Sequence, residues 1–156
     1  MPGLPPIIGA DSRTLILGSF PSQASLAARQ YYGHRQNQFW RILAAVTGEP
    51  LLDMDYAAKQ AAVLRNRLAI WDVYGNCRRE GSLDSAIREA TANDFRRLKK
   101  IAPRLQRVCF NGQTAGRFAR ELGAAGYQTC TLPSTSPTYT LSFALKLAAW
   151  REALLP

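Results

Sequence analysis

The stretch QYYGHRQNQF, residues 30–39, concentrates side chains that could do chemistry. It contains two tyrosines, the only histidine of the chain and the amide group of Asn37. Aromatic rings can stack on a planar ligand, whereas an amide side chain can hydrogen-bond a ring edge or hold a water molecule. This composition predicts a binding surface between a glycine-containing turn and a helix.

Other polar or small-residue segments follow short apolar runs. They are GSFPS (18–22), DVYGNC (72–77), FNG (110–112) and LPSTSP (132–137). If each apolar run is a strand of one parallel sheet, the carboxyl ends of the strands bring all four segments together, where such folds place their binding sites. We therefore expect these segments to converge on one site.

The elements that position these segments can be read from the apolar pattern. Strands are expected at 13–20, 67–74, 107–112 and within 127–132. One helix should begin at Phe39, because Phe39, Ile42, Leu43 and Val46 follow helical spacing, and Gly48 should end it. Phe39 and Trp40 are expected in the core. An alanine-rich segment, 55–66, predicts a second helix.

Three further helices are expected in the second half of the chain. Thr91 could cap a helix that places Phe95, Leu98 and Ala102 on one face, after a polar loop (76–87) that closes with a helical turn. The next helix should turn Ala115, Phe118, Ala119 and Leu122 inward and end at Gly123, and the last should use Leu141, Ala144, Leu145, Ala148 and Ala149. Strands alternating with helices predict an α/β fold, a parallel sheet covered on both faces.

Composition narrows the class of protein. A chain of 156 residues suits a single domain spanning 1–156, in which we expect residues 1–12 to be irregular. No apolar run approaches the roughly 20 residues of a membrane span. The N-terminus lacks the pattern of a signal peptide, so we expect a cytoplasmic protein. The net charge of +9 favours a polyanion such as nucleic acid, although basic domains without that function also exist.

Several kinds of site are excluded by the motifs. Cys77, Cys109 and Cys130 are isolated and the chain has one histidine, so no metal site and no cofactor are expected, and Cys109 and Cys130 should be small buried residues. The segment GSFPS is not the G-x-S-x-G elbow of the hydrolases. Neither a dinucleotide-binding nor a Walker phosphate motif is present.

Six motifs in this order resemble one family. LILGSFPSQASL, YYGHRQNQFW, WDVYGNCRREGSLDSAI, NDF, FNG and LPSTSP together are similar to the hypoxanthine-DNA glycosylase branch of the uracil-DNA glycosylase superfamily, from about residue 13 to residue 150. The resemblance implies an α/β fold, namely a three-layer α/β/α sandwich with a four-stranded, mostly parallel sheet. It further implies a monomeric, monofunctional glycosylase that flips a deaminated base, chiefly hypoxanthine, out of double-stranded DNA and removes it during base excision repair, near the nucleoid.

The resemblance also implies roles for particular residues. HRQNQFW matches a family motif whose asparagine positions the attacking water, which makes Asn37 the catalytic residue, whereas Phe20 stands where related mismatch-specific uracil glycosylases have that asparagine. Asn111 could read the edge of the base or be a plain turn residue before Gly112. The expected base-binding residues are Gly18, Ser19, Phe20, Tyr32 and Asn111, and the expected DNA-binding residues are Pro21, Ser22, His34, Ser134, Thr135, Ser136 and Pro137.

Two departures from the family pattern affect the same loops. Arg35 replaces the proline that follows the histidine, and Thr138-Tyr139 replace Ala-Asn after LPSTSP. No lysine lies within the motifs, so no lyase step through a Schiff base is expected. Two alternatives remain open: a glycosylase directed at uracil or mismatches, and a nucleic-acid-binding domain without activity.

Overall fold

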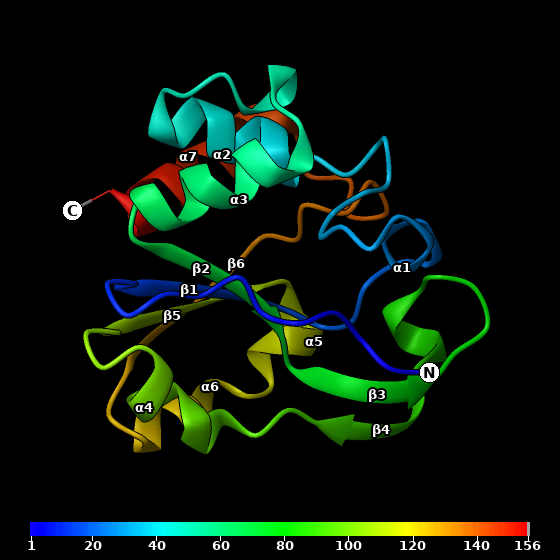
Figure 1. Cartoon of the computed structure of the whole chain (residues 1–156). Helices are drawn as coiled ribbons and strands as arrows, with labels where there is room; N and C mark the ends of the chain where they lie inside the picture. Colours follow the sequence, from blue (N-terminus) through cyan, green and yellow to red (C-terminus); the bar gives the residue numbers. More distant parts are fainter. Residues whose placement is uncertain (156) are drawn as a thin grey trace.

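A four-stranded parallel sheet lies at the centre of the protein (Figure 1), whose computed structural model describes residues 1–155. The strand order is β2-β1-β5-β6. Because all four strands run in the same direction, their carboxyl ends meet at one edge of the sheet. The strands are β1 (Thr14–Gly18), β2 (Leu68–Asp72), β5 (Arg107–Asn111) and β6 (Gln128–Leu132).

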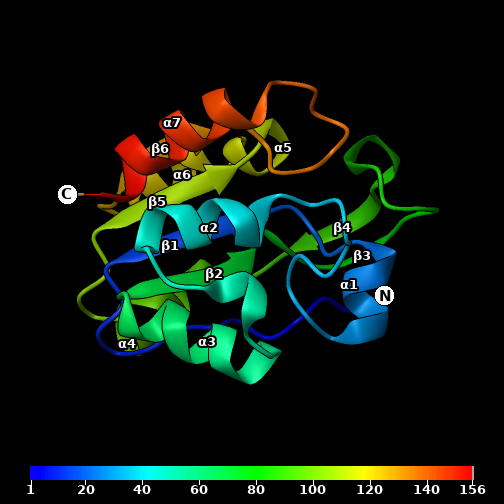
Figure 2. The ribbon, with the colours of Figure 1, turned by 90° about the horizontal axis from the view of Figure 1, so that it is seen from above.

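Helices cover both faces of this sheet (Figures 1 and 2), which confirms the three-layer α/β/α prediction. Successive strand side chains point to opposite faces, so Ile16 packs in one core cluster while Leu15 and Leu17 pack in the other. One layer contains α2 (Phe39–Thr47), α3 (Tyr56–Arg65) and α7 (Phe143–Leu154), and the other contains α4 (Leu98–Ile101), α5 (Gln113–Gly116) and α6 (Ala119–Ala124).

Helix α2 follows the predicted pattern. Phe39, Ile42 and Leu43 are buried, and Trp40 is buried beside them. Gly48 ends the helix with φ of 74°, a left-handed conformation in which glycine carries no steric penalty. The helix therefore begins at Phe39, directly after residues 30–38, which contain the candidate binding and catalytic side chains.

Residues 74–92 differ from the prediction of a polar loop. They form an antiparallel pair, β3 (Tyr74–Arg78) and β4 (Arg88–Ala92), with the predicted helical turn η2 (Asp84–Ala86) between them. Every residue of β4 is exposed, so no apolar alternation marks it in the sequence. Thr91 lies in β4 and cannot cap a helix. Asp94 takes that role instead, accepting the Arg96 N–H at the start of η3 (Phe95–Arg97).

Two other helices differ from expectation. The predicted helix after β5 is divided into α5 and α6, and Gly123 lies inside α6, which ends at Ala124. In α7 the predicted apolar face is wrong, because Leu145 is 58% exposed while Lys146 and Trp150 are buried. The buried face of α7 contains a lysine, which a purely apolar pattern does not detect.

The N-terminal segment runs along the open edge of β2. Residues 1–12 are irregular, as expected, but Ile7 exchanges two backbone hydrogen bonds with Ile70 of β2, at 2.9 and 2.8 Å. Farther along, Gly3 N–H donates to the carbonyl of Gly75, and the terminal amine donates to Asn76 Oδ1. Within residues 1–155, no helix is both long enough and apolar enough to cross a bilayer.

Candidate active site

A pocket of about 270 Å³ opens at the carboxyl edge of the sheet. Its walls come from the loop after β1, the stretch 30–38, the turn at 82–84 and the loop after β6. All the residues predicted as site residues lie around it, although their individual roles remain predictions. They are Gly18, Ser19, Phe20, Pro21, Ser22, Tyr32, His34, Asn37, Asn111, Ser134, Thr135, Ser136 and Pro137.

A short helix, α1 (Gln23–Ala28), brings the chain from β1 to the stretch 30–38. Ser22 caps this helix by accepting the Ser25 N–H at 3.1 Å, and its own hydroxyl donates to Ser25 Oγ. Arg29 and Tyr32 then both adopt left-handed backbone conformations, with φ of 55° and 54°. These two residues turn the chain back over the edge of the sheet.

The two adjacent tyrosines have different surroundings. Tyr31 is buried, its hydroxyl donates to the carbonyls of Leu4 and Pro5, and Trp40 Nε1 donates to its backbone carbonyl. Tyr31 therefore anchors the loop. The Tyr32 ring stacks on Phe39 with ring centres 3.9 Å apart and planes 16° from parallel. Both tyrosines line the pocket, but Tyr31 is buried and Tyr32 is only partly buried, so Tyr32 is the one that could stack on a bound base.

The amide of Asn37 is held by two donors. Its Oδ1 accepts the Phe39 N–H at 3.0 Å and the Thr135 hydroxyl at 2.8 Å. The loops that contain Asn37 and Thr135 are also joined through the backbone, because Gln38 N–H donates to the Thr135 carbonyl at 3.0 Å. Asn37 thus has a defined orientation on the pocket wall.

Asn111 is bonded to Thr135 at both ends of its amide. Its Oδ1 accepts the Thr135 N–H, and its Nδ2 donates to Thr135 Oγ1, each at 3.0 Å. Asn111 is therefore more than a plain turn residue, although Gly112 after it has φ of 93°. Thr135 has no exposed surface, so a direct contact with DNA, as predicted for it, is not possible in this conformation.

Ser19 and His34 are each engaged with other partners. Ser19 Oγ donates to Asp84 Oδ1 at 2.6 Å, and His34 Nδ1 accepts the Gln36 N–H at 3.1 Å. His34 is exposed at the pocket mouth. The hydroxyl of Ser19 and the Nδ1 atom of His34 are therefore bonded to different residues.

Asp72, at the end of β2, was missed as a site residue. Its side chain lines the pocket, and the buried Oδ2 has no hydrogen-bond partner. Burial and, to a smaller extent, the charge of Asp84 raise the pKa of this carboxyl to about 7, although the charge of Arg79 opposes both effects. The aspartate that ends an otherwise apolar strand, in AIWD, was the available signal. The other lining residues without a predicted role are Ser25, Tyr31, Ser82, Leu83, Asp84 and Thr138.

Lys146 ties the pocket loops to α7. Its Nζ donates to Gln38 Oε1 at 3.0 Å and to the Ser136 carbonyl at 3.1 Å, and burial lowers its pKa. Lys146 lies behind the loops and does not line the pocket.

Among the residues that the structure describes, no three His, Cys, Asp or Glu side chains are grouped as ligands of a metal ion. The pocket instead offers an oriented amide, an aromatic ring and a carboxyl group.

Comparison with known proteins gives consistent matches over nearly the whole chain. Residues 5–154 match the family model described as the uracil DNA glycosylase superfamily. A protein of Methanosarcina barkeri (strain Fusaro / DSM 804), named hypoxanthine DNA glycosylase, is 40% identical over 151 residues, covering 97% of this chain and 96% of that protein. A protein of the same name from Methanosarcina acetivorans is 43% identical over 134 residues, or 86% of this chain and 85% of that one.

A solved structure agrees with the same assignment of fold. The solution NMR structure of a candidate uracil DNA glycosylase from Methanosarcina acetivorans superposes with a TM-score of 0.90 at 38% identity. The superposition covers 98% of this chain and 95% of that one.

Proposed function

The chain belongs to the uracil DNA glycosylase superfamily, and from this premise we propose that it is a DNA glycosylase that removes hypoxanthine from DNA. The names of the two Methanosarcina relatives support hypoxanthine as the base. The observation in the pocket that carries the proposal is the amide of Asn37, which is oriented by two hydrogen bonds and lines the same pocket as Tyr32.

Cleavage of an N-glycosidic bond gives the sugar oxocarbenium character and leaves negative charge on the departing base. An oxocarbenium ion is reactive enough that a water molecule held in place can attack it without a strong base. Asn37 would hold this water. The N–H groups of Ser19 and Phe20, in the loop after β1, would stabilise the charge that develops on the base.

The pocket suits a single flipped base. Its volume of about 270 Å³ is near the lower end of the roughly 300–1,000 Å³ typical of small-molecule sites. The ring of Tyr32 would stack on the base, a contact worth about 1–3 kcal/mol. Asp72 lines the same space, and a carboxyl with a pKa near 7 can accept a hydrogen bond from a ring N–H or donate one to a ring carbonyl.

The finer features of the reaction are also part of the proposal. We expect double-stranded DNA as the substrate, a monomeric enzyme that acts in the cytoplasm, and base release without cleavage of the strand. The last expectation is supported by the position of Lys146, whose ammonium group is bonded behind the loops and away from the pocket. A Schiff-base lyase needs an amine that reaches the sugar.

Duplexes with a single deoxyinosine, deoxyuridine or deoxyxanthosine test the proposal. Base release is measured as strand cleavage after alkali, under single-turnover conditions, with Asn37→Ala as the matched inactive control. We expect the fastest release from the deoxyinosine duplex and no strand cleavage when alkali is omitted. If uracil is released faster than hypoxanthine, the protein is a uracil-directed glycosylase. If no base is released from any duplex, the alternative of a nucleic-acid-binding domain without activity is favoured.

A further inference from the structure

Thr135 is a polar residue of the candidate active site that has no exposed surface. Its hydroxyl lies between two amides: Asn111 Nδ2 at 3.0 Å and Asn37 Oδ1 at 2.8 Å. A buried hydroxyl that joins two amides can determine which end of each amide faces the pocket.

The direction of each hydrogen bond follows from one backbone group. The N–H of Thr135 can only donate, so the atom of Asn111 that faces it must be the carbonyl Oδ1. Asn111 therefore presents Nδ2, a donor, to Thr135 Oγ1. Because the threonine hydroxyl accepts this bond, its own proton remains available for Asn37.

The second amide is oriented in the same way. Asn37 receives the Thr135 O–H and the Phe39 N–H, both of which are donors, so the atom that faces them is Oδ1. Two donors occupy the two lone pairs of this carbonyl. The other end of the amide, Nδ2, is the end that remains for a molecule in the pocket.

Further hydrogen bonds join the two loops that contain Asn37 and Thr135. Gln38 N–H donates to the Thr135 carbonyl at 3.0 Å. Lys146 Nζ joins Gln38 to the carbonyl of Ser136, the residue after Thr135. These bonds hold the two loops together next to the hydrogen bond from Thr135 to Asn37.

We infer that Thr135 is a positioning residue, which orients the Asn37 side chain so that Nδ2, and not Oδ1, faces the pocket. This inference rests on the proposed function in so far as Asn37 is the catalytic residue. A donor at this place holds a water molecule through one of its lone pairs and leaves another to attack the sugar. Thr135 thus acts on the reaction through Asn37, without touching DNA.

The test compares Thr135→Val, which keeps the shape and removes the hydroxyl, with Thr135→Ser, which keeps the hydroxyl. Thr129→Val, the same change at an exposed position of β6, is the matched control. For Thr135→Val we expect single-turnover release of hypoxanthine to fall at least tenfold, with the Kd for the deoxyinosine duplex within twofold of wild type. Thr135→Ser should remain within threefold of wild type, and Thr129→Val should not differ from it.

A double-mutant cycle with Asn37→Ala separates positioning from general structural damage. In the Asn37→Ala background, adding Thr135→Val should change the residual rate by less than twofold, because the group that Thr135 orients is gone. An equal loss in both backgrounds, or a parallel loss of DNA affinity, would overturn the inference. So would a serine variant as slow as the valine variant. If Thr135→Val does not fold, Thr135→Ala carries the same comparison.

A second readout does not depend on glycosylase activity. The order parameter of the Asn37 side-chain NH2 group, from ¹⁵N relaxation, should be high in wild type and Thr135→Ser and should fall in Thr135→Val. If wild type releases no deaminated base, the proposed function fails while this measurement still decides the inference. An order parameter that is unchanged in Thr135→Val would refute the positioning role.

Discussion

The carboxyl group of Asp72 and the hydroxyl of Tyr32 meet beside the Cα of Gly18. A Cβ atom at Gly18 would lie 2.6 Å from Asp72 Oδ1 and 2.9 Å from the Tyr32 oxygen. Neither the Tyr32 hydroxyl nor Asp72 Oδ2 has a hydrogen-bond partner, although both are buried. Gly18 therefore leaves room for two buried polar groups at the floor of the pocket.

Gly18→Ala should therefore damage the site. The added methyl group must displace buried side chains on both sides, which typically costs about 1–3 kcal/mol of stability. We expect a lower Tm and slower base release, measured by thermal unfolding and single-turnover kinetics. Gly123→Ala in α6, where the nearest atom to a new Cβ is 3.9 Å away, is the control and should be tolerated. Equal behaviour of the two variants would contradict the close approach at Gly18.

Asp72→Asn should change how stability depends on pH. The folded protein binds the Asp72 proton more tightly than the unfolded chain, because burial raises the pKa from 3.8 to about 7. The wild-type free energy of unfolding therefore loses up to about 1.4 kcal/mol per pH unit from this group as pH rises between 4 and 7, and no more above that. Asparagine does not titrate, so the advantage of Asp72→Asn should grow over this window. Urea unfolding at pH 4.5, 6 and 8 measures it, and a difference that is independent of pH would show that Asp72 is not perturbed.

Asn37→Ala should nearly abolish base release while DNA binding stays close to that of wild type. The change removes the oriented amide and little binding surface. Single-turnover rates and the Kd for a deoxyinosine duplex separate the two effects. A rate within tenfold of wild type, which is a barrier change of about 1.4 kcal/mol, would remove Asn37 from the catalytic role.

Tyr32→Phe should be mild, whereas Tyr32→Ala should weaken engagement of the flipped base. The stack on Phe39 and the face toward the pocket both use the ring, and the hydroxyl has no hydrogen-bond partner. Loss of base stacking corresponds to about 1–3 kcal/mol. The Kd and the rate for both variants provide the comparison. Equal damage by phenylalanine and alanine would mean that the hydroxyl beside Asp72 is the functional group.

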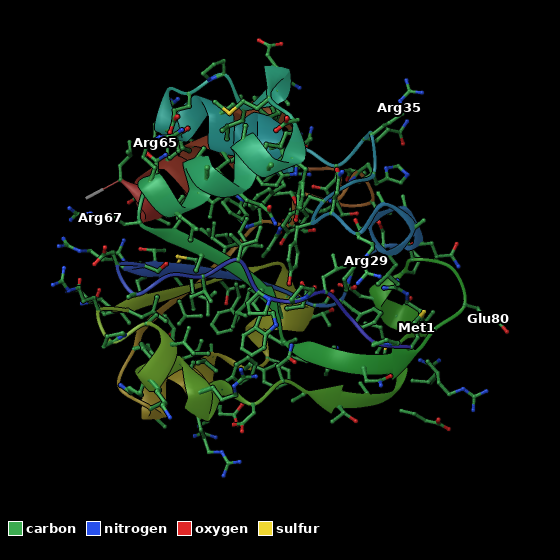
Figure 3. The ribbon with its side chains drawn as sticks, in the orientation of Figure 1. Met1, Arg29, Arg35, Arg65, Arg67 and Glu80 are labelled. Atoms are coloured by element: carbon green, nitrogen blue, oxygen red, sulfur yellow. The ribbon has the colours of Figure 1, made fainter. Side chains whose placement is uncertain are left out.

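DNA binding should weaken steeply as salt rises, because basic side chains release counterions from phosphates. Arg35 projects from the loop between α1 and α2 near the pocket mouth, whereas Arg65 lies at the far end of the molecule (Figure 3) and pairs with Glu49. Arg35→Ala should reduce the slope of log K against log salt by about 0.9, and Arg65→Ala should leave it unchanged. Identical slopes for Arg35→Ala and wild type would show that Arg35 does not contact a DNA phosphate.

Much of the scaffold could be predicted from the sequence because its signals are local. The strand 13–20 and the helix that begins at Phe39 show clear apolar periods, and the parallel order of strands brings Gly18 and Asn111 to one edge. The exposed strand β4 has no such period, so it was missed. The buried face of α7 was misplaced because Lys146 is buried through bonds to the Ser136 carbonyl and to Gln38, which lies 108 residues away in the sequence.

In the candidate site, too, the local motifs could be predicted from the sequence, whereas the contacts between them could not. Its residues lie in motifs that can be recognised one at a time, and the structure places them around one pocket. Several of their hydrogen-bond partners could not be predicted, because these partners lie 24 to 98 residues away in the sequence. Thr135 was expected to face DNA, but it is buried and bonded to Asn37 and Asn111. Asp72 was missed because its perturbed pKa arises from burial, which only the fold defines.

The N-terminal segment has a consequence for self-association. Strand β2 is an edge of the sheet, and the two hydrogen bonds with Ile7 occupy backbone groups of Ile70 that would otherwise be free. An uncovered edge strand can pair with the same strand of another molecule, and β2 is apolar from Leu68 to Trp71. Residues 1–8 thus cover this edge at Ile70, and we expect a chain shortened by these residues to aggregate through β2, which light scattering at increasing protein concentration would measure, even though its pocket residues are all present.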